Sequence, residues 1–161
     1  MSHKMRVRAA AILMHEDCIL LNEFCGGKYY NFPGGGIEEH ETAKQAVARE
    51  VMEEAGFTVA VGDLVFALEY EPQSCDYYYG NNPGISLFFR CDLDTSVPPQ
   101  MPSLPDISPD DCSASIAKWI PIAELSQVNF VPKIYEPLMG YIKTGVFTPS
   151  FWETHLCEAL C

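Results

Sequence analysis

GGGIEEHETAKQAVAREVMEEAGF, residues 34–57, is the stretch that decides the fold of this 161-residue chain. Its three glycines predict a sharp turn in which the backbone can closely approach a ligand or another strand. Thr42 and Gln45 have the spacing of a capping box, which predicts the start of a helix at Ala43. Gly56 predicts the end of that helix after Ala55. The stretch is therefore expected to fold as a glycine turn followed by a helix of thirteen residues.

The predicted helix carries three carboxylates on one face. At about 100° per residue, Glu54 lies about 40° to one side of Glu50, and Glu53 lies about 60° to the other. Like charges at these spacings destabilise a helix by a few tenths of a kcal/mol per pair. Arg49 can reach Glu53 but supplies only one positive charge. The face is therefore suited to a divalent cation with oxygen ligands, Mg²⁺ or Mn²⁺, although a charge run on a helix is also typical of a plain solvated surface.

Small and apolar residues flank these acids on the helical wheel. Ala43 and Ala46 share the acidic face nearer the helix start, so we expect open space between the carboxylates and the glycine turn. Val47 and Val51 lie to one side, where they should anchor the helix to a sheet. This arrangement of acids, space and glycine turn is typical of a binding site.

The rest of the chain predicts a mixed β-sheet between helices, an α/β fold with one domain over residues 1–161. We expect a proline-rich loop at about 94–113. We expect a hairpin of strands Val7–Met14 and Cys18–Phe24, β structure over Phe57–Tyr70 with a turn at Gly62-Asp63, strands at Ile85–Leu93 and Lys118–Ile120, a helical turn at Pro121–Ser126, a helix at Lys133–Lys143 and a short helix at about 151–160.

Composition excludes several classes of partner. The chain has 10 Lys and Arg against 22 Asp and Glu, a net charge of −12. Such a surface is repelled by nucleic-acid backbones and anionic membranes, so we expect neither as a partner. The apolar run Ala9–Met14 is too short to span a bilayer. Seven cysteines without C-x-x-C spacing predict reduced thiols in a cytoplasmic protein.

Between Gly35 and Phe57 the sequence also matches the pattern G-x5-E-x7-R-E-U-x-E-E-x-G-U, where U is a bulky apolar residue. The chain therefore resembles the Nudix hydrolases, and Phe32-Pro33-Gly34-Gly35 and Trp119-Ile120-Pro121 are similar to that family's flanking segments. The resemblance implies an α/β/α sandwich and an enzyme that uses Mg²⁺ or Mn²⁺. It implies a small-molecule substrate, a nucleoside diphosphate linked to a group X, cleaved to a nucleoside monophosphate and phosphorylated X.

The same resemblance assigns roles within the box. Glu50, Glu53 and Glu54 would bind metal together with the main-chain carbonyl of Gly34. Arg49 would orient the glutamates, and Glu50 is the first candidate for general base, which makes Glu50, Arg49 and Glu53 the expected catalytic residues. Structural roles fall to Gly35, Glu41 and Gly56. Some relatives use an acid outside the box, for which the candidates here are Asp106, Asp110 and Asp111.

Residues outside the box leave the substrate open. Pro72 has a spacing that in the family hints at ADP-ribose cleavage, but Glu71–Ser74 lacks the fuller serine-proline-glycine signature. Leu68–Glu71 is similar to the branch that removes oxidised deoxyguanosine triphosphate. Leu20–Glu23 lacks the arginine of that branch. Pool-cleansing and nucleotide-sugar pyrophosphatase activities both remain candidates, and a homodimer is neither indicated nor excluded. Substrate-binding candidates are Asp110, Asp111, Tyr78 and Asn129.

Two other functions share the fold. A nucleotide-binding sensor without activity is the main alternative, but sensors of that kind tend to have damaged boxes, and this one is intact. A prenyl-diphosphate isomerase is more remote, because its additional catalytic cysteine and glutamate motifs are missing.

Overall fold

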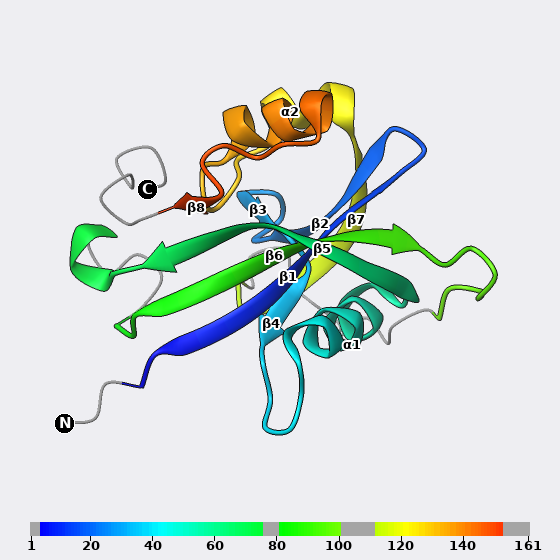
Figure 1. Ribbon diagram of the computed structural model, residues 1–161. Coiled ribbons are helices and arrows are strands. Elements are labelled where there is room, and N and C mark those ends of the chain that lie inside the picture. The colour runs from blue at the N-terminus through cyan, green and yellow to red at the C-terminus, as the bar shows by residue number, and fades with distance from the viewer. Residues whose placement is uncertain (1–3, 76–80, 101–111, 153–161) are drawn as a thin grey trace.

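The computed structural model describes residues 4–75, 81–100 and 112–152, and its centre is an eight-stranded mixed sheet (Figure 1). The main strand order is β3-β2-β1-β6-β5-β8, with β4 paired to β1 and β7 paired to β2. The strands are β1 Arg6–His15, β2 Cys18–Phe24, β3 Tyr29–Asn31, β4 Gly34–Gly36, β5 Val59–Tyr70, β6 Gly84–Leu93, β7 Ser115–Pro121 and β8 Phe151–Trp152. The helices are α1 Ala43–Ala55 and α2 Tyr135–Thr144, with 3₁₀ turns at Pro72–Cys75 and Ile122–Gln127.

The central strand β1 changes partners along its length. It runs parallel to β6 from Arg6 to Leu13, and the predicted hairpin with β2 is confirmed only at Met14 and His15. Where β1 and β2 separate, the glycine strand β4 pairs with β1 from Arg8 to Ala10. A side chain at Gly34 would overlap the main chain of β1 at Ala9 and Ala10. Glycine is therefore what allows β4 to lie this close to the central strand.

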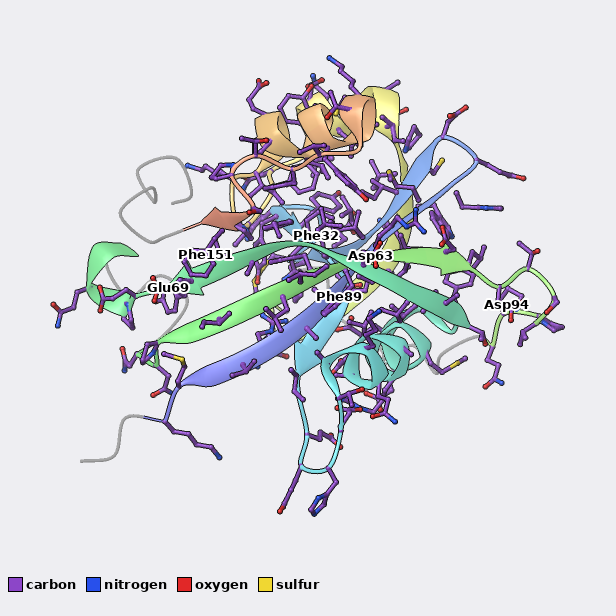
Figure 2. The ribbon with its side chains drawn as sticks, in the orientation of Figure 1. Phe32, Asp63, Glu69, Phe89, Asp94 and Phe151 are labelled. Carbon is purple, nitrogen blue, oxygen red and sulfur yellow. A yellow bond between two sulfur atoms is a disulfide. The ribbon has the colours of Figure 1, made fainter. Side chains whose placement is uncertain are left out.

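Helices cover both faces of the sheet, as the sequence predicts (Figure 1). Alternate residues of β1 supply the two cores: Ala9 and Leu13 pack on the α1 side, Ala10 and Ile12 on the α2 side. Phe89 lies on the α1 side and Phe32 on the α2 side (Figure 2). Within the described residues, no helix has the length and apolar character needed to cross a bilayer.

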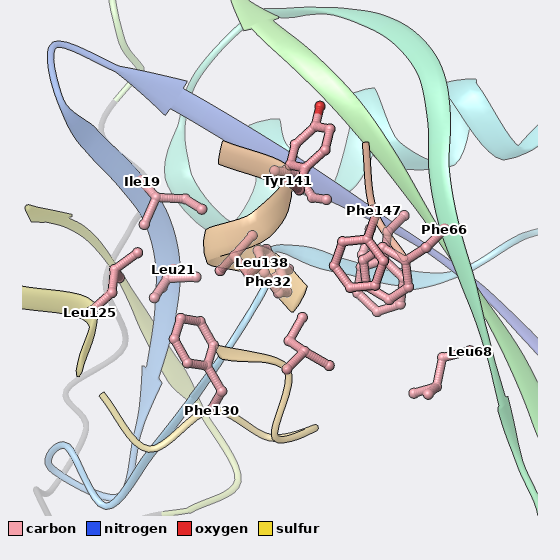
Figure 3. Packing of buried hydrophobic residues seen from close by; sticks show 14 residues of the cluster. Ile19, Leu21, Phe32, Phe66, Leu68, Leu125, Phe130, Leu138, Tyr141 and Phe147 are labelled. Atoms are coloured by element: carbon pink, nitrogen blue, oxygen red, sulfur yellow. The ribbon is translucent and has the colours of Figure 1, made fainter. Parts of the chain in front are cut away.

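The larger core lies between the sheet and α2 and is rich in aromatic rings (Figure 3). Phe66 stacks on Phe88 and on Phe147, with centroid separations of 4.1 and 3.9 Å. Leu138 from α2 and Phe32 from the segment before β4 are also buried there. This core fixes the segment that leads into the glycine strand.

Three predicted elements differ in the structure. The sharp turn expected at the three glycines is instead the short strand β4, because Gly34–Gly36 pair with Arg8–Ala10 of β1. Gly62-Asp63 is not a turn, because β5 continues through it with register shifts against β6 between Val61 and Phe66, the mark of a β-bulge. Pairing with β6 on both sides holds the extra residues in the strand. The helix expected from residue 151 is also wrong at its start, since Phe151 and Trp152 form β8 beside Ala67 and Leu68 of β5. The open edge of β5 prevails over the local capping signal. The remainder of the 151–160 prediction lies outside the described residues.

A disulfide links Cys25 to Cys112, whose Cα atoms lie 4.6 Å apart. The expectation of reduced thiols is therefore wrong for this pair. Its cause is the antiparallel pairing of β2 with β7 as far as Phe24 and Ser115, which brings the two flanking cysteines together. Among the described cysteines, Cys18 and Cys91 are free thiols.

Candidate functional site

The acidic face is held in place by the local design of α1. The Thr42 side chain accepts a hydrogen bond from the Gln45 amide, and Gln45 closes the capping box. Gly56 ends the helix in the left-handed conformation at φ 72°. Val47 and Val51 are fully buried against the sheet, as expected. The helix therefore presents its acids to β4 and the end of β2.

Arg49 forms hydrogen bonds with three glutamates around the acidic face. Its Nε and Nη2 donate to both carboxylate oxygens of Glu41, at 2.9 and 3.0 Å. Nη1 donates to Glu50 at 2.8 Å and to Glu53 at 3.2 Å, and Nη2 also donates to the carbonyl of Gly36 at 3.0 Å. These five contacts match the five N–H donors of a guanidinium. They raise the pKa of Arg49 and lower that of Glu41. The expected reach of Arg49 to Glu53 is confirmed, and Glu41 does connect loop to helix.

Glu54 turns away from Arg49 toward the strands. Its Oε2 accepts hydrogen bonds from the Asn22 side chain at 2.8 Å and from the Gly34 amide at 2.9 Å. Burial raises the pKa of Glu54, and these two hydrogen bonds oppose that rise. Asn22 is 1% exposed, and its Oδ1 has no hydrogen-bond partner within the described residues. This asparagine links α1 to β2 and was not among the residues predicted from the sequence. It could have been found as a single amide side chain within an apolar strand.

The space expected between the acids and the glycines is not present. A Cβ at Gly35 would overlap the Glu50 carboxylate, so the backbone of β4 lies directly against that side chain. Ala46 is fully buried in the apolar cluster beneath α1, and Ala43 packs against the same cluster. The two alanines therefore serve the core rather than opening a cavity beside the acids.

The donor set nevertheless suits a divalent cation. Within the described residues, no three His, Cys, Asp or Glu side chains surround a common point, because Arg49 holds Glu50 and Glu53 while Glu54 faces Asn22. Among the described residues, four carboxylates, those of Glu41, Glu50, Glu53 and Glu54, share this region with two guanidiniums, those of Arg8 and Arg49. Two negative charges are left without a cation, and all the donors are hard oxygens. By chemistry and charge the residues fit Mg²⁺ or Mn²⁺.

A pocket of about 350 Å³ is lined by residues of several strands. Arg6, Arg8 and Ser86 line it from β1 and β6, and Tyr29 and Asn31 line it from β3. Tyr29 stacks on Phe24 at a centroid distance of 4.8 Å, and both rings border the pocket.

Arg8 connects the pocket to the acidic face. Its Nη2 donates to the Gly34 carbonyl at 2.9 Å, and its charge interacts with those of Glu54 and Glu50. The carbonyl predicted as a metal ligand is thus occupied by a guanidinium donor in this structure. A ligand in the pocket that contacts Arg8 would extend toward the carboxylates.

Of the predicted substrate residues, Asn129 is the one within the described part of the chain, and it does not line this pocket. Tyr78, Asp106, Asp110 and Asp111 lie outside the described residues. Asn129 is exposed and donates its side-chain amide to the Lys28 carbonyl at 2.8 Å, so it fixes a loop. The pocket arginines were missed, although Arg6 and Arg8 alternate in a strand and so must share one face.

Comparison with known proteins gives one family. The sequence model of the NUDIX domain matches residues 4–139. A 40-residue segment is 55% identical to the 8-oxo-dGTP diphosphatase of Escherichia coli K12, over 25% of this chain and 31% of that protein. The fold is similar to that of a NUDIX hydrolase from Nitrosomonas europaea, with a TM-score of 0.64 and 22% identity over 89% of this chain and 93% of that one. It is also similar to a UDP-X diphosphatase, with a TM-score of 0.63 and 16% identity over 94% and 68% of the two chains.

Proposed function

The chain belongs to the Nudix family, and we propose that it is a hydrolase that uses a divalent cation to cleave the diphosphate linkage of a nucleoside diphosphate derivative. The products are a nucleoside monophosphate and a second phosphorylated fragment. The observation that carries the proposal is Arg8, which lines the pocket and also donates to the Gly34 carbonyl beside the acidic face. One bound molecule can therefore place its organic part in the pocket and its phosphates at the carboxylates.

Glu50, Glu53 and Glu54 are the residues that would hold Mg²⁺ or Mn²⁺. The cation, when bound, neutralises charge on phosphoryl oxygens and lowers the pKa of a bound water. Arg49 keeps Glu50 and Glu53 oriented through hydrogen bonds of 2.8 and 3.2 Å. Glu50, which contacts Arg49 and lies against Gly35, is our candidate for the base that accepts the proton of the attacking water. Arg8 is placed to bind phosphate oxygens as the linkage is broken.

The pocket supports a nucleotide-sized ligand. Its volume of about 350 Å³ is in the range typical of small-molecule sites. Phe32 and Phe88 supply apolar surface, and Tyr29 supplies a ring on which a base can stack. Nucleotide-pool cleansing and nucleotide-sugar cleavage both fall within the proposed class.

The direct test is a turnover screen with Mg²⁺ over dNTPs, nucleotide sugars, ADP-ribose, NADH, dinucleoside polyphosphates and coenzyme A. On the best substrate, Glu53→Gln and Glu54→Gln should slow turnover and require more Mg²⁺. Glu50→Gln should lower kcat by roughly 10²- to 10⁴-fold with little rescue by Mg²⁺, as expected for loss of a general base. Glu124→Gln, an exposed glutamate in the 3₁₀ turn after β7, is the matched control and should leave turnover unchanged. Nucleotide binding without any turnover would instead support the sensor function.

A further inference from the structure

Two arginines of β1 line the pocket, and the charge of one of them, Arg8, also interacts with those of Glu54 and Glu50. Arg6 and Arg8 stand two residues apart on the same face of β1, and both line the pocket. Across the part of the chain that the structure describes, neither guanidinium has a carboxylate within 4.0 Å. In a chain with 22 acidic and only 10 basic residues, two arginines without ion pairs in one cavity indicate a site for an anion.

The energetics of Arg8 support this interpretation. Its pKa is lowered mainly by burial and then by the charge of the exposed Arg6, while the charges of Glu54 and Glu50 oppose that shift. The single acceptor that Arg8 contacts is the neutral carbonyl of Gly34. A charged group that is partly buried beside a like charge is stabilised strongly when an anion binds to it.

The two arginines are spaced so that each can bind a different anionic group of one ligand. Arg8 contacts Gly34, at the acidic face where the diphosphate is expected. Arg6 pairs with Gly84 and lines the pocket, as does Asn82. Two residues of strand separate the Cα atoms of Arg6 and Arg8 by about 6.6 Å. The two guanidiniums can therefore contact two separate anionic groups.

We propose that the Arg6 end of the pocket binds a phosphate monoester that the substrate carries in addition to its diphosphate linkage, such as a phosphate on a ribose hydroxyl. The inference rests on the proposed function for the position of the diphosphate. Arg6 donates to the additional phosphate, and the Asn82 side chain, which also lines the pocket, supplies a neutral donor. Arg6 thereby selects phosphorylated nucleotides over their unphosphorylated counterparts.

The test is a binding measurement that needs no catalysis. Isothermal titration calorimetry with AMP, adenosine 2′,5′-bisphosphate and adenosine 3′,5′-bisphosphate compares ligands that differ by one phosphate. At least one bisphosphate should bind about tenfold more tightly than AMP, equivalent to about 1.4 kcal/mol. Arg6→Gln should reduce that ratio to about one. Arg90→Gln, which changes the net charge equally but lies on β6 outside this pocket and pairs with Asp92, should preserve it.

A turnover measurement adds a second readout. In the wild type, kcat/KM for NADPH should exceed that for NADH, and Arg6→Gln should bring the ratio of the two values to about one. Equal affinities for AMP and both bisphosphates, equal effects of the two arginine variants, or no binding of any of the three would overturn the inference. Hydrolysis in the screen together with equal affinities leaves the proposed function standing, whereas a bisphosphate preference without hydrolysis of any diphosphate overturns that function and keeps the phosphate site.

Discussion

The three successive glycines of β4 should respond in three different ways to the same substitution by alanine. A Cβ at Gly34 would overlap main-chain atoms of Ala9 and Ala10, which cannot move without displacing the central strand. A Cβ at Gly35 would overlap the carboxylate of Glu50, which is the free end of a side chain and can swing aside. A Cβ at Gly36 would meet no atom within 4 Å. The substitution should therefore affect mainly stability at Gly34, mainly activity at Gly35 and neither at Gly36.

The magnitudes follow from what each methyl group displaces. Gly34→Ala overpacks the sheet and should cost about 3 kcal/mol, which lowers Tm by roughly 10 °C in a chain of this size. Gly35→Ala should break the 2.8 Å contact between Arg49 and Glu50, a loss of about 1.5 kcal/mol. Alanine offsets about 0.4–1 kcal/mol of that by restricting the unfolded chain. The net change should stay within about 1 kcal/mol.

Turnover should be strongly affected at Gly35, where the loss of stability is small. Displacing Glu50 by about 1 Å should lower kcat roughly 10²-fold in Gly35→Ala, while Gly36→Ala should retain near-normal kcat and stability. Thermal melts of the metal-free protein and turnover of the best substrate from the screen measure both quantities. Normal kcat in Gly35→Ala would refute the assigned role of Glu50. A loss of stability in that variant as large as in Gly34→Ala would refute the argument that the Glu50 side chain can yield.

Three further outcomes are expected. Mg²⁺ at 100 times its Kd should stabilise the fold by about 2.7 kcal/mol, because it relieves repulsion among the α1 carboxylates. If adding Mg²⁺ leaves the Tm unchanged, both with and without nucleotide, the metal site is contradicted. Reducing the Cys25–Cys112 bond, whose cysteines are 87 residues apart, should lower the free energy of unfolding by up to about 4 kcal/mol in urea titrations, and identical midpoints in the oxidised and reduced protein would contradict this. Burial raises the pKa of the Cys91 thiol to about 12, so it stays protonated and unreactive at pH 8. Peptide mapping after iodoacetamide treatment should find the half-buried Cys18 labelled first, and equal labelling would count against the burial of Cys91.

Local signals in the sequence were sufficient for the element that carries the acids. Thr42, Gln45 and Gly56 act within one turn of the helix ends, and the observed bounds of α1 are the predicted ones. The wheel likewise gave the contact of Arg49 with Glu53, because i,i+4 neighbours meet in any regular helix.

Features that join distant segments could not be obtained in this way. Asn22 holds Glu54 from a strand 32 residues earlier, and Arg8 reaches the Gly34 carbonyl 26 residues later. Such contacts depend on strand order, which hydrophobic periodicity does not encode. Phe151 shows the converse error, since a local capping signal was overridden by the free edge of β5. The roles of Tyr78, Asp110 and Asp111 stay predictions.

The parallel pairing of β1 with β6 has a consequence for synthesis of the chain. Arg6 pairs with Gly84 and Leu13 with Cys91, so the central strand leaves the ribosome seconds before its partner, at roughly 5–20 residues per second. In that interval β2 and β4 can cover one edge of β1, while the other edge stays open to pairing with neighbouring chains. A polypeptide interrupted before Gly84 would contain the whole acidic helix and still lack β6, the parallel partner of the central strand. Completion of the site is therefore coupled to the late arrival of β6, and we expect slow codons or chaperones to matter most in that interval.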